Sequence, residues 1–125
     1  MGVLSVNAEI GDPKAEHFQS VEFTVDTGSS HTCLPASFLR ELGVEPHARQ
    51  RFVLADGRRV DSDIGRAWLR IDGQQEITIV VFAEEGTQPL LGAITLEEFG
   101  LGVDPVAQKL VPVVKYRLTR IRFGD

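Results

Sequence analysis

The chain has 125 residues, of which 42% are hydrophobic and 25% are charged, and its formal net charge is −5 at pH 7. These values are typical of one globular domain over residues 1–125, and they argue against a disordered chain and against a nucleic-acid binder. The single Cys33 excludes an intramolecular disulfide, no apolar run could span a bilayer, and residues 1–10 lack a signal peptide, so we expect a cytoplasmic protein without membrane contact.

Alternating apolar and polar residues predict strands in the first third of the chain. A turn at residues 11–14 separates two such segments and predicts a hairpin that delivers Asp26 to its tip. The expected elements are strands over residues 1–10, 21–26 and 31–34, a helix over residues 36–42 ended by Gly43, and a polar connection over residues 44–51.

Asp-Gly pairs predict two turns in the rest of the chain, at Asp56-Gly57 within a hairpin and at Asp72-Gly73. Thr95 and Glu98 fit the pattern of a capping box at the start of a helical turn. The other expected elements are a strand over residues 64–71, an apolar strand over residues 77–82 buried on both faces, a loop at 84–87, a brief strand at 89–92, a helical turn at 95–99, and β structure over 101–103 and 109–123. The chain is therefore predicted to be mainly β.

An acid directly follows the predicted strand over residues 21–26. Asp26 is followed by residues that form turns or carry hydroxyls, namely Thr27, Gly28, Ser29 and Ser30. Gly28 permits a turn with positive φ, and the hydroxyls can bond to local backbone or to a neighbouring carboxylate. A carboxylate held in this way suits general acid–base catalysis, whereas the alternative is an aspartate that only starts a turn.

Three stretches occur in an order that resembles the retropepsin-like aspartic proteases, in particular their small bacterial and archaeal single-domain members. They are Asp26-Thr27-Gly28 at a strand end, a hairpin tipped by Ala55, Asp56 and Gly57, and Leu90-Leu91-Gly92 before a short helix. The resemblance covers nearly the whole chain. It implies a retropepsin-like closed β-barrel, the acid protease half-fold, with one or two short helices in a two-fold homodimer.

The resemblance also implies roles for these residues. Asp26 would be the catalytic acid, supported by Thr27, Gly28 and Ser29. The flap that contacts the substrate would be tipped by Ala55, Asp56 and Gly57, and the loop beneath the site would be formed by Leu90, Leu91 and Gly92.

Peptide hydrolysis by this route needs two carboxylates that share one proton across a bound water. An isolated aspartic acid, with an ordinary pKa of about 3.9, is ionised at neutral pH and cannot act as the acid. The sequence has one Asp-Thr-Gly and no Asp-Ser-Gly, so the second carboxylate must come from Asp26 of a second copy. We therefore expect a homodimeric endopeptidase that acts on peptides or proteins, with water as nucleophile and no metal or other cofactor.

Other candidate sites have weaker patterns. The three histidines have no Cys or carboxylate at metal-ligand spacing, and Cys33 fits a buried thiol better than a Cys-His nucleophile. Trp68 fits either packing or a cleft wall, while Arg58 and Arg59 fit either a soluble hairpin or the selection of acidic substrates. The alternative function is a catalytically silent protease-fold module for dimerisation or peptide binding, which would tolerate Asp26→Asn.

Overall fold

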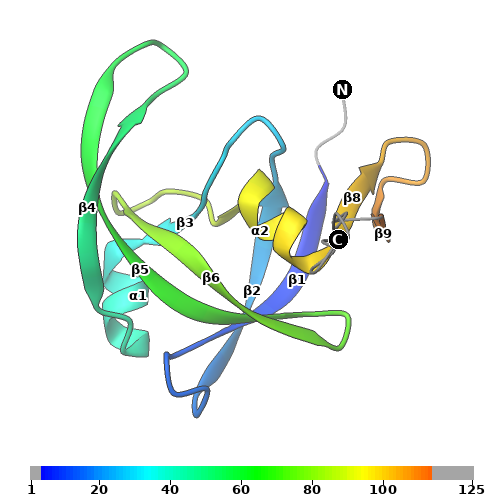
Figure 1. Cartoon of the computed structure of the whole chain (residues 1–125), viewed down its shortest axis with the longest axis horizontal. Helices are drawn as coiled ribbons and strands as arrows, with labels where there is room; N and C mark the ends of the chain where they lie inside the picture. The colour runs from blue at the N-terminus through cyan, green and yellow to red at the C-terminus, as the bar shows by residue number, and fades with distance from the viewer. Residues whose placement is uncertain (1–3, 114–125) are drawn as a thin grey trace, which may run out of the picture.

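The computed structural model describes residues 4–113, which form nine strands and two short helices (Figure 1). In chain order the elements are β1 (Ser5–Gly11), β2 (Phe18–Val25), β3 (Thr32–Pro35), α1 (Ala36–Leu42), β4 (Pro46–Val53), β5 (Arg59–Ile71), β6 (Gln74–Ala83), β7 (Leu90–Leu91), α2 (Ala93–Phe99), β8 (Leu101–Asp104) and β9 (Lys109–Pro112). The prediction of a mainly β chain with short helices is confirmed. Residues 1–3 of the predicted first strand and the part of the predicted last strand beyond residue 113 lie outside the described residues.

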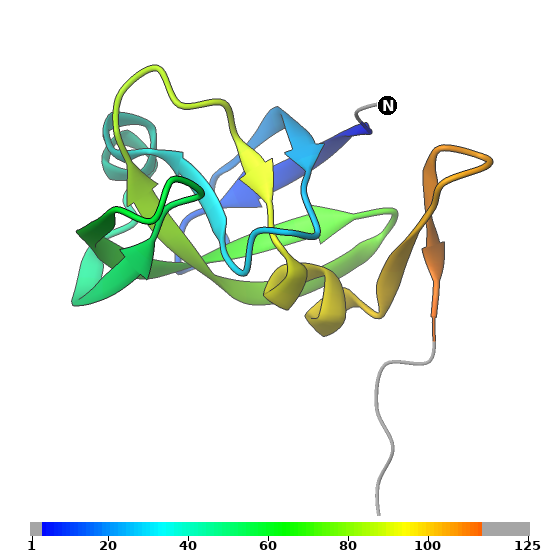
Figure 2. The same ribbon diagram turned by 90° about the horizontal axis from the view of Figure 1, so that it is seen from above.

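Seven strands form one sheet in the order β1-β2-β7-β3-β6-β5-β4, and β8 pairs with β9 separately. The 13-residue strand β5 is long enough to pair with β4 and β6 and, in addition, with β1, where Ile10 lies opposite Leu69. This extra pairing leads from β5 back to β1, so the strands wrap around a shared interior (Figure 2).

The interior is filled by apolar side chains from almost every element of the sheet. Among the largest fully buried side chains are Ile10, Phe23, Leu34, Leu69 and Leu91. Burying a side chain of this size contributes about 2 kcal/mol, so the ends of the strands that carry these residues are held firmly. A residue placed directly after such a strand end, as Asp26 is after β2, therefore starts from a rigid element.

One predicted connection is a strand. The prediction of a polar connection over residues 44–51 is wrong, because β4 pairs with β5 in antiparallel register from Pro46 to Val53. Nearly all side chains of β4 are exposed. Because the strand has no buried face, its sequence lacks the alternation of apolar and polar residues that indicates a strand. Ion pairs across the hairpin, from Arg49 to Asp63 (2.9 Å) and from Arg51 to Asp61 (3.1 Å), replace apolar packing.

The predicted burial of residues 77–82 on both faces is only partly correct. Val80, Val81 and Phe82 are buried, but Ile77 is 38% exposed. The reason is position along the strand: the half of β6 next to the Asp72-Gly73 turn has one face covered by the core and the other open. The turn itself is confirmed, with positive φ at both residues.

The predicted capping box at Thr95 and Glu98 is wrong. Helix α2 starts earlier, at Ala93, with Gly92 as the residue before it, and no side chain caps this end. The amide of Leu96 donates to the carbonyl oxygen of Gly92 (3.2 Å), so Thr95 already lies inside the helix. Its hydroxyl is used elsewhere, in contacts described below.

Asp12 fixes the β1–β2 turn that sets up the strand leading to Asp26. Its Oδ1 accepts the amide N–H groups of His17 (2.7 Å) and Glu16 (2.9 Å), and the bond from His17 is the main cause that lowers the pKa of Asp12 below its ordinary value of 3.8. A carboxyl whose pKa is lower in the folded state adds stability that is fully present above the unfolded pKa and is lost as the pH falls through the folded pKa.

We therefore expect the melting temperature of the natural protein to fall more between about pH 5 and about pH 2 than that of Asp12→Asn. The asparagine keeps an oxygen acceptor for the turn but has no charge to titrate, and thermal melts followed by circular dichroism measure the difference. Equal falls for the two proteins would contradict this assignment.

Candidate active site

Asp26 lies directly after β2, with an exposed side chain. The prediction that the β1–β2 hairpin carries Asp26 at its tip is wrong, because the tip is the turn between Gly11 and Phe18 and Asp26 follows the opposite end of β2. Its amide N–H donates to the carbonyl oxygen of Leu91 (3.0 Å), which ties the residue to β7. Its Oδ1 accepts the amide N–H of Gly28 (2.9 Å), and its carbonyl oxygen accepts the amide N–H of Ser29 (3.1 Å). The carboxylate is therefore oriented by its own turn while it remains open to solvent or to a second molecule.

Gly28 serves this turn for a different reason from the one predicted. Its φ is not positive, so the conformational freedom of glycine is not what the turn requires. A Cβ atom at this position would lie 3.2 Å from Asp26 Oδ1, which is a tight contact. Glycine therefore keeps the space beside the carboxylate open.

The segment that joins β2 to β3 crosses the end of β7. Strand β7 lies between these two strands, parallel to β2 and antiparallel to β3 (Figure 2). The amides of Ala93 and Ile94 donate to the carbonyl oxygens of Ser29 (2.8 Å) and Ser30 (3.0 Å). We call residues 26–31 the Asp26 loop; Leu90, Leu91 and Gly92 lie against it.

Gly92 is where the two segments approach most closely. A Cβ atom on this residue would lie 2.4 Å from the carbonyl carbon of His31 and 2.7 Å from its amide nitrogen, both backbone atoms. The φ of Gly92 is −97°, a value that other residues adopt freely. The requirement for glycine is therefore purely one of space.

The predicted hairpin over Ala55, Asp56 and Gly57 is present, and its tip is exposed. The amide of Leu54 donates to the carbonyl oxygen of Arg58 (2.7 Å), and Gly57 has a φ of 87°, which favours glycine. The hairpin extends from the body of the molecule on the same side as the Asp26 loop (Figure 1). This placement is compatible with a flap.

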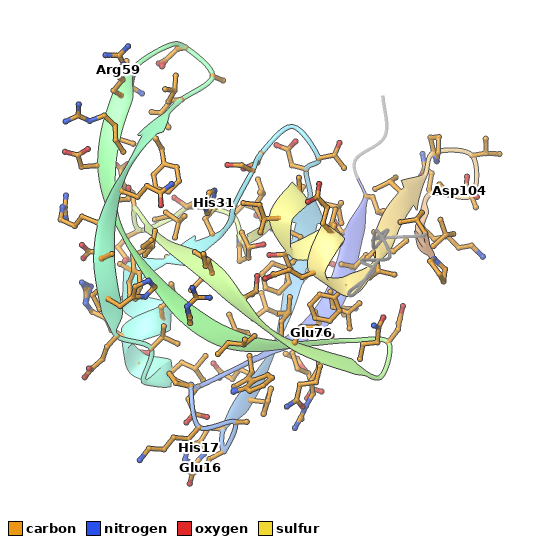
Figure 3. All side chains as sticks on the ribbon, in the orientation of Figure 1. Glu16, His17, His31, Arg59, Glu76 and Asp104 are labelled. Carbon is orange, nitrogen blue, oxygen red and sulfur yellow. The ribbon has the colours of Figure 1, made fainter. Side chains whose placement is uncertain are left out.

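A contact between the Asp26 loop and the end of β4 next to the hairpin tip was not predicted. The ring of His31 packs edge-on against the ring of Phe52 in β4, with 5.0 Å between centroids, and His31 lies between the hairpin and α2 (Figure 3). The hydroxyl of Ser30 lies 2.7 Å from His31 Nδ1, and burial lowers the pKa of His31. The available signal was Phe52, a large aromatic side chain in a strand whose residues are otherwise mostly small or polar.

The other candidate residues named from the sequence do not contact the Asp26 carboxylate. Arg58 Nε donates to Asp56 Oδ2 (2.7 Å) within the hairpin tip, and Arg59 lies at the end of the hairpin away from the loop (Figure 3). Trp68 Nε1 donates to the carbonyl oxygen of Pro13 (3.0 Å), so Trp68 packs at the β1–β2 turn and is no cleft wall. Burial raises the pKa of the Cys33 thiol, which is the opposite of what a nucleophile needs.

Within residues 4–113, no three or more His, Cys, Asp or Glu side chains are grouped so that they could hold a metal ion. Neither α1 nor α2 has the length and apolar character needed to cross a membrane.

The sequence profile of the aspartyl protease family matches residues 6–94, which is more than half of the chain. The chain therefore belongs to the aspartyl protease family. A comparison with curated protein sequences finds no significant match.

Solved structures with a similar fold are retropepsin-like. A retropepsin-like aspartic protease from Rickettsia conorii has a TM-score of 0.59 at 21% identity, over 82% of this chain and 77% of that chain. The retroviral protease-like domain of Ddi1 from Leishmania major has a TM-score of 0.58 at 17% identity, over 90% and 89%. EIAV protease complexed with the inhibitor HBY-793 has a TM-score of 0.58 at 15% identity, over 79% and 89%. These likenesses show that the fold is retropepsin-like.

Proposed function

We propose that the protein is a homodimeric aspartic endopeptidase in which Asp26 of two copies activates a water molecule against a peptide bond. The observation that carries the proposal is the state of Asp26, an exposed carboxylate oriented by the Gly28 amide at the end of β2, a strand anchored in the core by Phe23. Membership of the aspartyl protease family and the retropepsin-like fold support it.

The two carboxyl groups share one proton in the proposed site. One acts as a base and removes a proton from the water, while the other donates a proton to the oxygen of the scissile carbonyl. The water oxygen bonds to the carbonyl carbon, which gives a tetrahedral intermediate. The C–N bond then breaks as the carboxyl group that took up the water proton gives it to the leaving amine. In each copy the Gly28 amide donates to one oxygen of the Asp26 carboxylate. Both carboxyl groups are therefore already oriented before the substrate binds.

The neighbouring residues have supporting roles in this proposal. Thr27 is exposed beside Asp26, and we assign to its hydroxyl the contact with the opposite loop that holds the two carboxylates together. The open space at Gly28 lets a substrate backbone approach, and the hairpin tipped by Ala55, Asp56 and Gly57 closes over it. Phe52 and Val60, which pair across the hairpin, share the face that meets His31.

A peptide-library assay at several protein concentrations tests the proposal. We expect the purified protein to cleave a mixed peptide library between about pH 4 and pH 8, with products identified by mass spectrometry. Because the site needs two chains, the rate per mole of chain should fall on dilution below the dimer dissociation constant. A rate per mole that stays constant where sedimentation shows only monomer would overturn the two-chain site.

A further inference from the structure

Three buried threonine hydroxyls link the base of the Asp26 loop to the far end of α2. Thr32 in β3, Thr78 in β6 and Thr95 in α2 have no exposed surface. The Gly92 amide donates to Thr32 Oγ1 (3.0 Å), and Thr95 Oγ1 lies 2.6 Å from Thr32 Oγ1 and 2.8 Å from Thr78 Oγ1. Thr78 Oγ1 donates to Glu98 Oε1 (2.6 Å). We call this series the hydroxyl chain.

The Glu98 carboxylate fixes the direction of every bond in the hydroxyl chain. A hydroxyl has one hydrogen, and Thr78 gives its hydrogen to Glu98, so Thr78 must accept from Thr95. Thr95 has then used its own hydrogen and must accept from Thr32. The lone pairs of Thr32 Oγ1 consequently remain available to the Gly92 amide, which can only donate.

The direction of these hydrogen bonds matters because both ends of the Asp26 loop are held by Leu91 and Gly92. Leu91 accepts the Asp26 amide, and Gly92 lies against the backbone of His31 with no room for a methyl group. Thr32 follows His31 directly, so the hydrogen bond from the Gly92 amide to the Thr32 hydroxyl holds the C-terminal end of the Asp26 loop against the residue that precedes α2. Buried hydroxyls that are all satisfied specify one arrangement of the groups they join.

We propose that the hydroxyl chain positions the Asp26 loop, with Thr95 as its central member and Glu98 as the acceptor that directs it. Its consequence for catalysis rests on the proposed function, whereas its hold on the loop does not. Thr32, Thr78, Thr95 and Glu98 are positioning residues, since they act through Gly92 and the loop.

The test compares Thr95→Val, which keeps the shape but removes the hydroxyl, with Thr95→Ser, which keeps the hydroxyl. We expect Thr95→Val to speed hydrogen exchange of the Gly92 amide by about 10-fold or more and to lower kcat by a similar factor, with KM changed by no more than about 2-fold. Thr95→Ser should restore both quantities to near the natural values.

Two control variants separate positioning from stability and from charge. Ile71→Val, at a buried position outside the hydroxyl chain, should lower the melting temperature without lowering kcat. Glu98→Met, which has no oxygen to accept the Thr78 hydrogen, should slow turnover, whereas Glu97→Met on the same helix should not. If Thr95→Val does not fold, Glu98→Met gives the same test through the same two measurements.

The outcomes are distinct for this proposal and for the proposed function. Unchanged Gly92 exchange and unchanged kcat in Thr95→Val would overturn the hydroxyl chain as a positioning device. If the natural protein hydrolyses no peptide, the proposed function fails, and the exchange of Gly92 in these variants still decides whether the chain holds the loop.

Discussion

Replacing Asp26 with asparagine is expected to lower the rate of peptide hydrolysis by at least about 10³-fold. The carboxamide is nearly the same shape, and its oxygen can still accept the Gly28 amide, so the turn should be preserved. It cannot exchange the proton that the mechanism moves, and in a homodimer the substitution removes both carboxyl groups at once. A chromogenic or fluorogenic peptide found with the library measures the rate, and circular dichroism shows that the fold is retained.

Asp72→Asn is the matched control for this variant. Asp72 is an exposed aspartate in the β5–β6 turn with a φ of 49°, a conformation that asparagine tolerates well. We expect it to hydrolyse peptides at the natural rate. Turnover that survives Asp26→Asn would remove Asp26 from the mechanism, and peptides bound by the natural protein but never cleaved would favour the catalytically silent module.

Gly92→Ala is expected to lower the free energy of unfolding by about 3 kcal/mol or more. The added methyl group would meet three backbone atoms of His31 at 2.4 to 2.7 Å, and backbone cannot move aside as a flexible side chain can. Relief of the contact requires the Asp26 loop to separate from β7, so whatever activity the protein has should be lost with it. Urea denaturation measures the change in stability.

Gly86→Ala is a control that separates crowding from backbone strain. Gly86 has a φ of 86° and no atom within 4 Å of an added Cβ, so its replacement should cost only the roughly 1–2 kcal/mol of a left-handed residue. Gly92 has the reverse properties, an ordinary φ and no space. Equal losses of stability in the two variants would show that the approach of His31 to Gly92 is looser than described.

The position of the candidate site could be predicted from the sequence because its parts are local. Strand alternation places Asp26 at a strand end, and the Asp56-Gly57 pair marks the hairpin turn by residue type alone. The place of Leu91-Gly92 beneath the Asp26 loop was expected only from the family resemblance. The helix over residues 36–42 was also predictable, since helical spacing and Gly43 define it.

What could not be predicted depends on contacts between distant parts of the chain. Strand β4 has no buried face, and only its pairing with β5 makes it a strand. Thr95 and Glu98 have the spacing of a capping box, yet their partner is Thr78, 17 residues before Thr95, and Thr32 is 63 residues before Thr95. No local pattern in one sequence joins three threonines at such separations.

The most direct measurement is the distance between the two Asp26 carboxyl groups in a crystal structure of the active protein. We predict a two-fold dimer in which an oxygen of one Asp26 lies within about 3 Å of an oxygen of the other, close enough to share a proton. A structure of hydrolytically active protein in which each Asp26 is alone, with no second carboxylate within hydrogen-bond distance, would contradict a catalytic site built from two copies of the Asp26 loop.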